Sequence, residues 1–420
     1  TPDQPLEVRL DPWHTTYDWD RRNDVAGPNP LGLGGAQAVF DWPFLDQSNR
    51  DHALVALSPM AWYSNGGAMT IGVRARTNYA GLVDRYDFGL AVGTASRTTA
   101  RGLAPSGASR VQAWWRFENP YPGFASAPLI GLSGGAALLD GIARVDLSQR
   151  WDLSPLWTAR GPQVSASLGA TGAYPYDRAM LPEGWDDRAL TELHGTFGIR
   201  VPRALLADSG YSSVDAGAGV GVAAHAPSTY GRAELTARSA NYWNGGANAL
   251  LLRAYGALSS ATPAQAALHL SAESPLETFA NDWYRPQGAI LKRPGVNFLP
   301  FGGAGLRAYD PMVTVRRILA VNGEMAQRLV PMFFDRLSLW GSVFGDAGFA
   351  SSTTYTLDGA FLADAGAGLA VRGKLYDRDV TLRLDVPLFA HQPALAGGRG
   401  LTKSGADVAA RWVFSFSDLW

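Results

Sequence analysis

The sequence has no cysteine, only three lysines and few charged residues for its length of 420. Without cysteine the chain can form neither disulfide bonds nor thiolate-ligated metal sites, and this absence is neutral about the compartment. Charged residues make up 17% of the chain, against roughly 25% in a typical soluble protein. The net charge of −1 gives no sign of a surface that binds nucleic acid.

Long apolar runs are also missing, because no segment approaches the roughly 18 residues that a membrane-spanning helix needs. A helical membrane protein is therefore excluded. The chain is rich in glycine, with 48 residues, and in aromatic residues, with 14 Trp, 15 Tyr and 17 Phe, and this composition does not fit a disordered chain. A mean hydropathy of −0.07 requires apolar and polar residues to be finely mixed. These observations leave a large all-β protein, which is a soluble sandwich, a propeller or a membrane barrel.

Alternation of apolar and polar residues is the main structural signal. In the segment 379–388, one face of a strand would carry Val380, Leu382, Leu384, Val386 and Leu388, and the residues between them are mostly polar. Segments of this kind predict about sixteen strands, at 36–41, 52–58, 68–76, 85–95, 109–118, 141–151, 163–173, 188–201, 211–223, 229–243, 248–259, 314–329, 336–348, 363–373, 379–388 and 405–417. A short apolar piece at 266–273 either lengthens a strand or belongs to a loop.

Two features favour a barrel in lipid over a soluble sandwich, whose polar face would meet solvent. The predicted polar faces carry Gly, Ser and mixed Arg and Asp. Aromatic residues also gather near strand ends, where an interfacial girdle would lie, at Trp62–Tyr63, Trp114–Trp115, Tyr242–Trp243 and Trp412–Trp420. We therefore predict an all-β fold, a transmembrane antiparallel β-barrel of about sixteen strands, located in a bacterial outer membrane.

Arginine accounts for 33 of the 36 basic residues. A GC-rich genome produces this bias, and the planar guanidinium group also suits pairing with carboxylates in a half-dry lumen. For the domain organisation we predict a non-barrel lead-in at 1–35 and a barrel at 36–420. The stretch 274–312 is rich in Pro and Gly and far longer than most loops, and loops of that length are usually functional or disordered.

Five short motifs follow one another in the last third of the chain, from residue 297 onward. They are the segments Phe301–Tyr309, Ala320–Met325, Phe344–Gly348, Gly366–Arg372 and Leu382–Leu388. In this order they resemble the bacterial surface-antigen barrel superfamily, which includes outer-membrane assembly proteins and two-partner-secretion transporters. The resemblance implies a sixteen-stranded barrel in which the loop 274–312 folds back into the lumen.

The same resemblance implies an anchor for that loop. The tip motif corresponds to Gly302, Gly303, Leu306, Arg307 and Tyr309, with Ala308 standing where the family has glycine. In the family the loop arginine pairs with an aspartate of a Phe-x-Asp-x-Gly strand, which here reads Phe344, Asp346 and Gly348. We therefore expect a charge-assisted Arg307–Asp346 pair inside the barrel; the alternative is an ordinary loop arginine and a strand-end aspartate.

Strand parity agrees with an inward-facing Asp346. Alternation over 336–348 places one set of residues toward lipid, namely Leu337, Leu339 and Val343. The other set would face the lumen, namely Ser338, Ser342 and Asp346.

Both ends of the chain add a resemblance of their own. The segments 11–23 and 57–76 look like the C-terminal barrel that is fused behind aminopeptidase-N-like zinc metallopeptidases in some Gram-negative bacteria. This implies an associated peptidase domain. The C-terminal pattern resembles the signal that outer-membrane barrels present to the barrel assembly machinery, and it consists of Trp412, Phe414, Phe416 and Trp420. The expected partners are thus the lipid bilayer, that machinery and a soluble peptidase domain.

Catalytic and metal-binding patterns are not convincing in this sequence. Gly131–Gly135 fits the Gly-x-Ser-x-Gly pattern around Ser133, but it reads as a Gly-rich link between strands and lacks the strand–turn–helix setting of a nucleophile elbow. No His-Glu-x-x-His is present, and the six histidines have no ligand spacing. We predict no catalytic residue, no metal and no cofactor in this chain.

Three functions stay open on the sequence. The leading interpretation is an outer-membrane barrel that anchors, or supports passage for, an associated soluble domain, with the lumen plugged by 274–312. The first alternative is a protein translocation or insertion pore, which weak pairing between 36–41 and 405–417 would favour. The second is a barrel lipid hydrolase, for which Ser133 is the serine to mutate and His194 or His225 could act with a nearby serine.

Overall fold

The structure is a computed structural model of the whole chain. It describes the residues 8–9, 25–26, 37–41, 54–64, 68–78, 85–94, 110–119, 129–139, 141–154, 161–180, 187–207, 209–224, 228–260, 266–271, 296–297, 303–309, 313–332, 337–352, 357–375, 378–391 and 412–415.

Nearly all of these residues belong to strands. The first group is β1 (Val8–Arg9), β2 (Val25–Ala26), β3 (Gln37–Phe40), β4 (Leu54–Ser64), β5 (Ala68–Asn78), β6 (Arg85–Gly93), β7 (Val111–Asn119), β8 (Leu129–Leu139), β9 (Ile142–Asp152), β10 (Gln163–Pro175) and β11 (Leu190–Val201). The second group is β12 (Ser209–Ala223), β13 (Ser228–Trp243), β14 (Asn248–Ser259), β15 (Leu268–His269), β16 (Val296–Asn297), β17 (Thr314–Val315), β18 (Arg317–Met332), β19 (Leu337–Ser352), β20 (Leu357–Leu375), β21 (Arg378–His391) and β22 (Trp412–Ser415). One 3-10 turn, η2 (Arg178–Met180), lies between β10 and β11. Across these described ranges, no helix is long and apolar enough to cross a bilayer.

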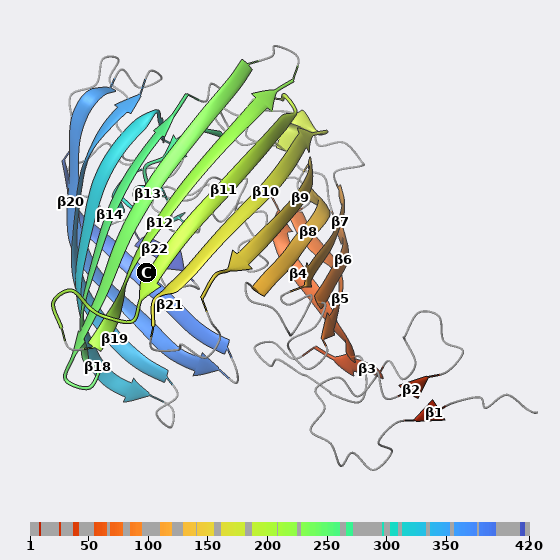
Figure 1. The fold of residues 1–420 in the computed structure, drawn as a ribbon, viewed down its shortest axis with the longest axis horizontal. Coiled ribbons are helices and arrows are strands. Elements are labelled where there is room, and N and C mark those ends of the chain that lie inside the picture. Colours follow the sequence, from red (N-terminus) through yellow and green to blue (C-terminus); the bar gives the residue numbers. More distant parts are fainter. Residues whose placement is uncertain are drawn as a thin grey trace, which may run out of the picture.

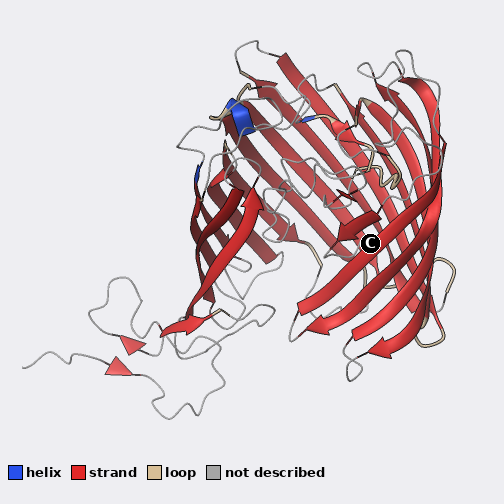
Figure 2. Cartoon of the chain, turned by 180° about the vertical axis from the view of Figure 1, so that it is seen from behind, coloured by secondary structure: helices blue, strands red, loops and turns tan. Residues whose placement is uncertain are grey.

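The strands form one large barrel sheet (Figure 1). Sixteen of the described strands, β4 to β14 and β18 to β22, follow one another as antiparallel neighbours. The strand order is that of a closed barrel, with the four-residue strand β3 beside β4 in parallel pairing and β16 beside β22, also parallel. Two small sheets, β1–β2 and β15–β17, are separate from the barrel sheet. Figure 2 shows the long strands of the wall from the other side.

This architecture confirms the predicted fold class of an antiparallel barrel of about sixteen strands, and it corrects two strand assignments. The segment around Gly131–Gly135 is not a link, because it lies within β8 and pairs with β9 along its whole length. Conversely, 36–41 is not the first antiparallel strand, because β3 pairs with β4 in parallel. The piece at 266–273 contributes β15, which pairs with β17 of the loop region.

Side chains sort by parity between the two faces of the wall. On β18, the odd-numbered Leu319, Val321 and Met325 are 54–64% exposed on the outside. The alternate residues Asn322 and Glu324 are buried on the inside at 4% and 2%. Since a strand turns successive side chains to opposite faces, the outer face is apolar and the inner face polar. This sorting is what a barrel in a bilayer requires.

One of the aromatic pairs that suggested a girdle, Trp114–Trp115, divides between the two faces. Trp115 is 41% exposed on the outer face, whereas Trp114 is 4% exposed and faces the lumen. The Trp114 indole lies over Gly89, where a Cβ would come within 2.0 Å of Cη2, and its Nε1 donates to Asp87 Oδ1 at 3.1 Å. Trp114 is therefore not part of an interfacial girdle, which corrects the prediction for this residue. The cause is that neighbours in a strand always face opposite ways.

The wall is uneven in height, and its connections are uneven in length. Strands β4 to β9 have 9 to 11 residues, close to the roughly 9–11 that a tilted strand needs to cross the bilayer, whereas β18 to β21 have 14 to 19. Because the strands alternate in direction, the four longest connections leave the barrel at the same end, at 94–110, 176–189, 260–316 and 392–411. The loop that contains the predicted tip motif is one of them.

A charge placed on the outer face tests the assignment of the two faces. We expect Val343→Arg, at a position 60% exposed on the outer face of β19, to lower the free energy of unfolding in lipid vesicles by about 2–4 kcal/mol. Thr196→Arg is the control, because Thr196 is exposed on the inner face of β11 and its change should have a much smaller effect. Denaturant titrations of the two variants would contradict the assignment if their losses were equal.

Candidate functional site

The described tip of the long loop, residues 303–309, lies buried inside the barrel. Ala304, Leu306 and Tyr309 are completely buried in an apolar cluster with residues of β15, β17 and the wall. The backbone is tied to the segment before it, because the Leu306 N–H donates to the Leu270 carbonyl at 3.0 Å. The apolar side chains thus pack the tip, and its polar groups must find partners on the inner wall.

Arg307 projects from this tip into a group of carboxylates. Its side chain is 1% exposed, and Nη1 donates to Glu324 Oε2 of β18 at 3.0 Å. Its Nε lies 3.2 Å from Asp346 Oδ2 of β19, and Nη1 lies 3.7 Å from Asp385 Oδ2 of β21. The guanidinium group also lies over the Phe344 ring, 4.0 Å from its centroid.

A second buried arginine connects the same carboxylates from the wall. Arg383 of β21 donates from Nε to Asp385 Oδ2 at 2.7 Å and from Nη1 to Glu324 Oε1 at 3.0 Å. Glu324 and Asp385 therefore each accept from Arg383 while they also face Arg307. We call the group of Arg307, Glu324, Asp346, Arg383 and Asp385 the loop-anchoring cluster. Such a cluster is stable only when its charges are paired, because an unpaired buried charge is costly.

The residues 303–305, which precede Arg307 and which we call the stem of the loop tip, are held by side chains of the wall. Asn322 of β18 donates from Nδ2 to the carbonyls of Ala304 at 3.2 Å and Gly305 at 3.1 Å. Arg253 of β14 donates to the Gly303 carbonyl at 2.5 Å and to Asn322 Oδ1 at 3.1 Å. Side chains from two neighbouring strands thus donate hydrogen bonds to the carbonyls of the stem. These hydrogen bonds do not involve Arg307.

Tyr309 connects the loop to the ladder between β20 and β21. Its hydroxyl lies 2.6 Å from the His391 carbonyl and 3.2 Å from the Ala363 carbonyl, and it accepts the Ala363 N–H at 3.0 Å. These contacts occur close to the register shift at Ala365/Gly366. Burial raises the pKa of the Tyr309 hydroxyl, so it stays neutral over the physiological range.

The structure brings together most of the predicted loop residues that it describes. Arg307 and Asp346 are in contact through one nitrogen and one oxygen, Leu306 and Tyr309 are buried, and Gly303 has a φ of +55°. Gly348 lies against β18, where a Cβ would come within 2.5 Å of the Leu319 carbonyl oxygen. Ala308, in place of the family's glycine, does not have a positive φ and donates its N–H to Asp364 Oδ2 at 3.3 Å.

Other predicted residues lie outside the part of the chain that the structure describes. They are Gly302, Phe416 and Trp420, together with most of 274–312 and of the lead-in 1–35. Trp412 and Phe414 belong to the backbone of β22. The C-terminal signal therefore stays a prediction.

Several residues of the site were given no role by the sequence alone. Glu324, Arg383 and Asp385 lie within motifs that carried the resemblance, and Arg253 and Asp364 occupy inward positions of alternating strands. The available signal was a charged residue on the polar face of the strands next to the loop. That signal does not say which charges meet, because contact depends on the register between strands.

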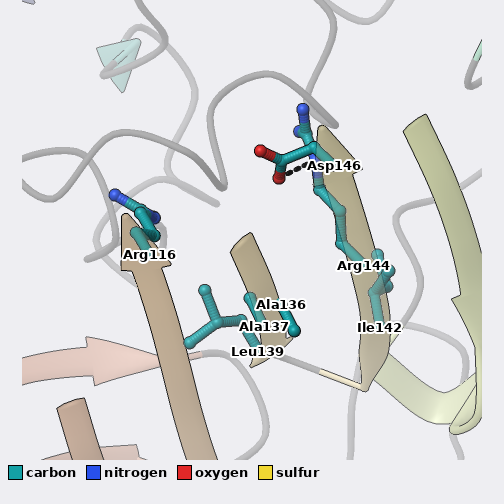
Figure 3. Close-up of a pocket in the computed structure, with 7 residues that line it drawn as sticks. All are labelled: Arg116, Ala136, Ala137, Leu139, Ile142, Arg144 and Asp146. Carbon is teal, nitrogen blue, oxygen red and sulfur yellow. Dashed lines mark ion pairs between the residues drawn. The ribbon is translucent and has the colours of Figure 1, made fainter. Parts of the chain in front are cut away.

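Ion pairs between side chains from different parts of the chain recur along the inner wall. Examples are Arg74–Asp87, Arg76–Asp41, Arg232–Glu192 and Arg238–Asp215. Near the turn between β8 and β9, Arg116 faces a small hollow opposite Arg144 and Asp146 (Figure 3), and Arg144 Nε lies 3.5 Å from Asp146 Oδ1. These pairs have more exposed side chains than the loop-anchoring cluster, so each contributes less to stability.

Ser133 lies on the inner face of β8, with its Oγ 2.7 Å from Ser148 Oγ of β9. His194 of β11 lies in the same row of the wall, two strands beyond Ser148, with Gly169 between them. A strand interior gives Ser133 no turn that would expose it as a nucleophile elbow does. Within the described ranges, no group of three or more His, Cys, Asp or Glu residues is arranged to hold a metal ion.

Comparisons with known proteins identify no family for this chain. No family model matches the sequence, and no curated protein matches it. Among solved structures, the fold is similar to BamA from Haemophilus ducreyi lacking POTRA domains 1–3, with a TM-score of 0.46 and 10% sequence identity over 85% of this chain and 69% of that chain. A likeness of this extent says nothing about function, which must be argued from the site itself.

A single glycine tests how tightly the stem is held. Gly305 has a φ of +67°, and a Cβ there would come within 3.0 Å of Arg253 Nη1 and 3.3 Å of Asn322 Nδ2. We expect Gly305→Ala to lower the free energy that keeps the loop tip bound in the lumen by at least about 1–2 kcal/mol, because a residue other than glycine is strained in the left-handed conformation. The control is Gly323→Ala on β18, because a Cβ there meets its nearest atom at 3.8 Å.

The chain's lack of cysteine supplies the measurement. Ala304→Cys puts one thiol at a completely buried position of the tip, and its rate of labelling by a polar thiol reagent reports how often the loop leaves its site. Gly305→Ala should raise this rate about tenfold, and Gly323→Ala should not. Equal rates in both variants would show that Gly305 is not needed for seating.

Proposed function

We propose that the chain is an outer-membrane barrel whose lumen is closed by its own loop and which supports the passage of an associated polypeptide. The observation that carries this proposal is the loop-anchoring cluster, in which a loop arginine with 1% side-chain exposure is held by carboxylates of three wall strands. The exposed apolar outer face supports the location in a bilayer.

The size of the barrel favours passage over simple anchoring. About eight strands already make a barrel whose interior its own side chains fill, and larger barrels enclose a channel or a plug. A barrel that only anchors a soluble domain has no need for a lumen of sixteen strands. The plug here is held in part by charged groups, which water solvates again when the loop leaves.

The unequal connections support an orientation. Barrels of bacterial outer membranes have short periplasmic turns and longer extracellular loops. We therefore place the end with the four longest connections, 260–316 among them, outside the cell. The loop then enters the lumen from the outside, and an associated soluble partner would meet the barrel at the periplasmic end.

A second candidate is insertion of polypeptide through the wall. The ends of the strand order support it, because within the described residues three residue pairs connect β21 to β22 and four connect β3 to β4, whereas fifteen connect β12 to β13. Few ladder hydrogen bonds mean a low free energy of local opening. A wall that opened at this join would release strands laterally into the bilayer.

The partners stay predictions of the sequence. A metallopeptidase domain and the barrel assembly machinery are implied by the resemblances alone. We also propose that this chain carries no catalytic centre, so that any chemistry belongs to an associated domain. The position of Ser133 within β8, next to another serine, supports this more than it supports a lipid hydrolase.

Planar-bilayer recordings test the closed lumen. We expect the wild-type chain to show little conductance and Arg307→Ala to show frequent openings, because removing one partner of a buried ion pair costs about 3–5 kcal/mol. Even the lower figure raises the open fraction roughly a hundredfold. Arg238→Ala is the matched control, because Arg238 pairs with Asp215 on the inner wall but is 30% exposed.

Two results would contradict the closed lumen. Large, steady currents from the wild-type chain would show that the loop does not close the barrel. Identical low conductance of wild type and Arg307→Ala would show that the loop-anchoring cluster is not what holds it closed.

Hydrogen exchange tests the join between the strand ends. We expect the backbone amides of β3 and β22 to exchange at least about tenfold faster than those of β12 and β13 in the folded barrel. Uniform protection around the wall would count against lateral opening while leaving passage through the lumen unaffected.

A further inference from the structure

Two aspartates face each other beside the loop tip. Asp346 of β19 and Asp364 of β20 are register partners on the inner wall, and each is 3% exposed. This pairing of two buried carboxyl groups places them to share a hydrogen bond. An ionised carboxylate only accepts hydrogen bonds, so such a bond can form only when one of the two groups carries a proton.

The remaining partners show which aspartate is neutral. Asp346 Oδ1 accepts from Asn322 Nδ2 at 3.1 Å, and Oδ2 lies 3.2 Å from Arg307 Nε. Asp364 Oδ2 accepts one neutral donor, the Ala308 N–H, at 3.3 Å. Among the described residues, Asp346 Oδ2 and Asp364 Oδ1 find no hydrogen-bond donor. The guanidinium group thus favours the charged form at Asp346, and the proton belongs on Asp364.

The other charged groups nearby are engaged elsewhere. Arg383 is bonded to Glu324 and Asp385, and Arg307 is divided among Glu324, Asp346 and Asp385. Arg372, on the same strand as Asp364, lies 4.0 Å from Glu324. His391 of β21 is exposed and contacts the outward-facing Phe361 ring. Within the part of the chain that the structure describes, the Asp364 carboxyl accepts the Ala308 N–H and faces Asp346.

We propose that Asp364 is a further anchoring residue of the loop, which acts as a neutral acid that donates its proton to Asp346 and accepts the Ala308 N–H. The inference rests on the proposed closure of the lumen by the loop. Loss of the proton sets two facing carboxylates against each other in a dry site, and the tip that both of them hold is released. The anchor therefore depends on pH through a group that the tip motif does not contain.

Three substitutions separate a neutral acid from an ionised one, with the Ala304→Cys labelling rate as readout. Asp364→Ala should raise the rate at least about tenfold, because the Ala308 N–H and Asp346 both lose a partner. Asp364→Asn should restore slow labelling, because an amide both donates and accepts as the neutral acid does. Asp346→Asn should instead give fast labelling, because Arg307 needs the negative charge of Asp346.

A pH profile tests the shared proton itself. As the pH is raised from neutral into the alkaline range, the labelling rate of the Asp364-containing chain should increase at least about tenfold more than that of Asp364→Asn, because only the first can lose the shared proton. The Asp364→Asn chain carries the same introduced thiol, so the comparison of the two chains removes the effect of thiol ionisation on the labelling rate. Asp215→Asn is the matched control, because Asp215 pairs with Arg238 on the inner wall, and it should follow the wild-type profile.

Infrared spectroscopy detects the protonated carboxyl group directly. The wild-type barrel should show the carbonyl stretch of a neutral carboxylic acid, and Asp364→Asn should remove this band. Parallel pH profiles, or loop release by Asp364→Asn as large as that by Asp364→Ala, would overturn the proposal. Neither result contradicts the closed lumen, which the bilayer recordings on the wild-type chain and Arg307→Ala test separately.

Discussion

The burial of the Arg307 charge inside the barrel is the constraint on which the rest of the site depends. A guanidinium group with 1% side-chain exposure needs carboxylates at fixed positions, and they come from β18, β19 and β21. Three strands of the wall are thereby tied to one residue of the loop. The apolar side chains around it, such as Leu306, pack the tip, and the Tyr309 hydroxyl ties the tip to β20 and β21.

The wall that presents these carboxylates is built by the simplest rule of strand geometry. Successive side chains alternate between faces, so an apolar outside and a polar inside need only a period of two. The inner face then carries ion pairs between strands, as in Arg74–Asp87 on adjacent strands and Arg232–Glu192 across β12. Where Asp346 and Asp364 face each other, the proton that we propose on Asp364 removes one of the two negative charges.

The sequence predicted the faces of the strands better than their pairing. Alternation correctly placed Val343 outside and Asp346 inside. It missed β8, because the glycines of Gly131–Gly135 have no side chain that could reveal a period. It counted β3 among the antiparallel strands, because alternation is the same in both pairing directions. The contact between Arg307 and Asp346 was expected from a resemblance, since no local pattern connects residues that lie so far apart in the chain.

The amino-acid sequence by itself determined an all-β chain with apolar and polar faces, since that information is local and repeats every two residues. Only the tertiary structure decided which inward-facing charges share a site. Arg253, Glu324, Asp364 and Arg383 meet the loop because strand register and the curvature of the wall bring them to one height of the lumen. Those are long-range properties, set by all the neighbouring strands together, so no single segment encodes them.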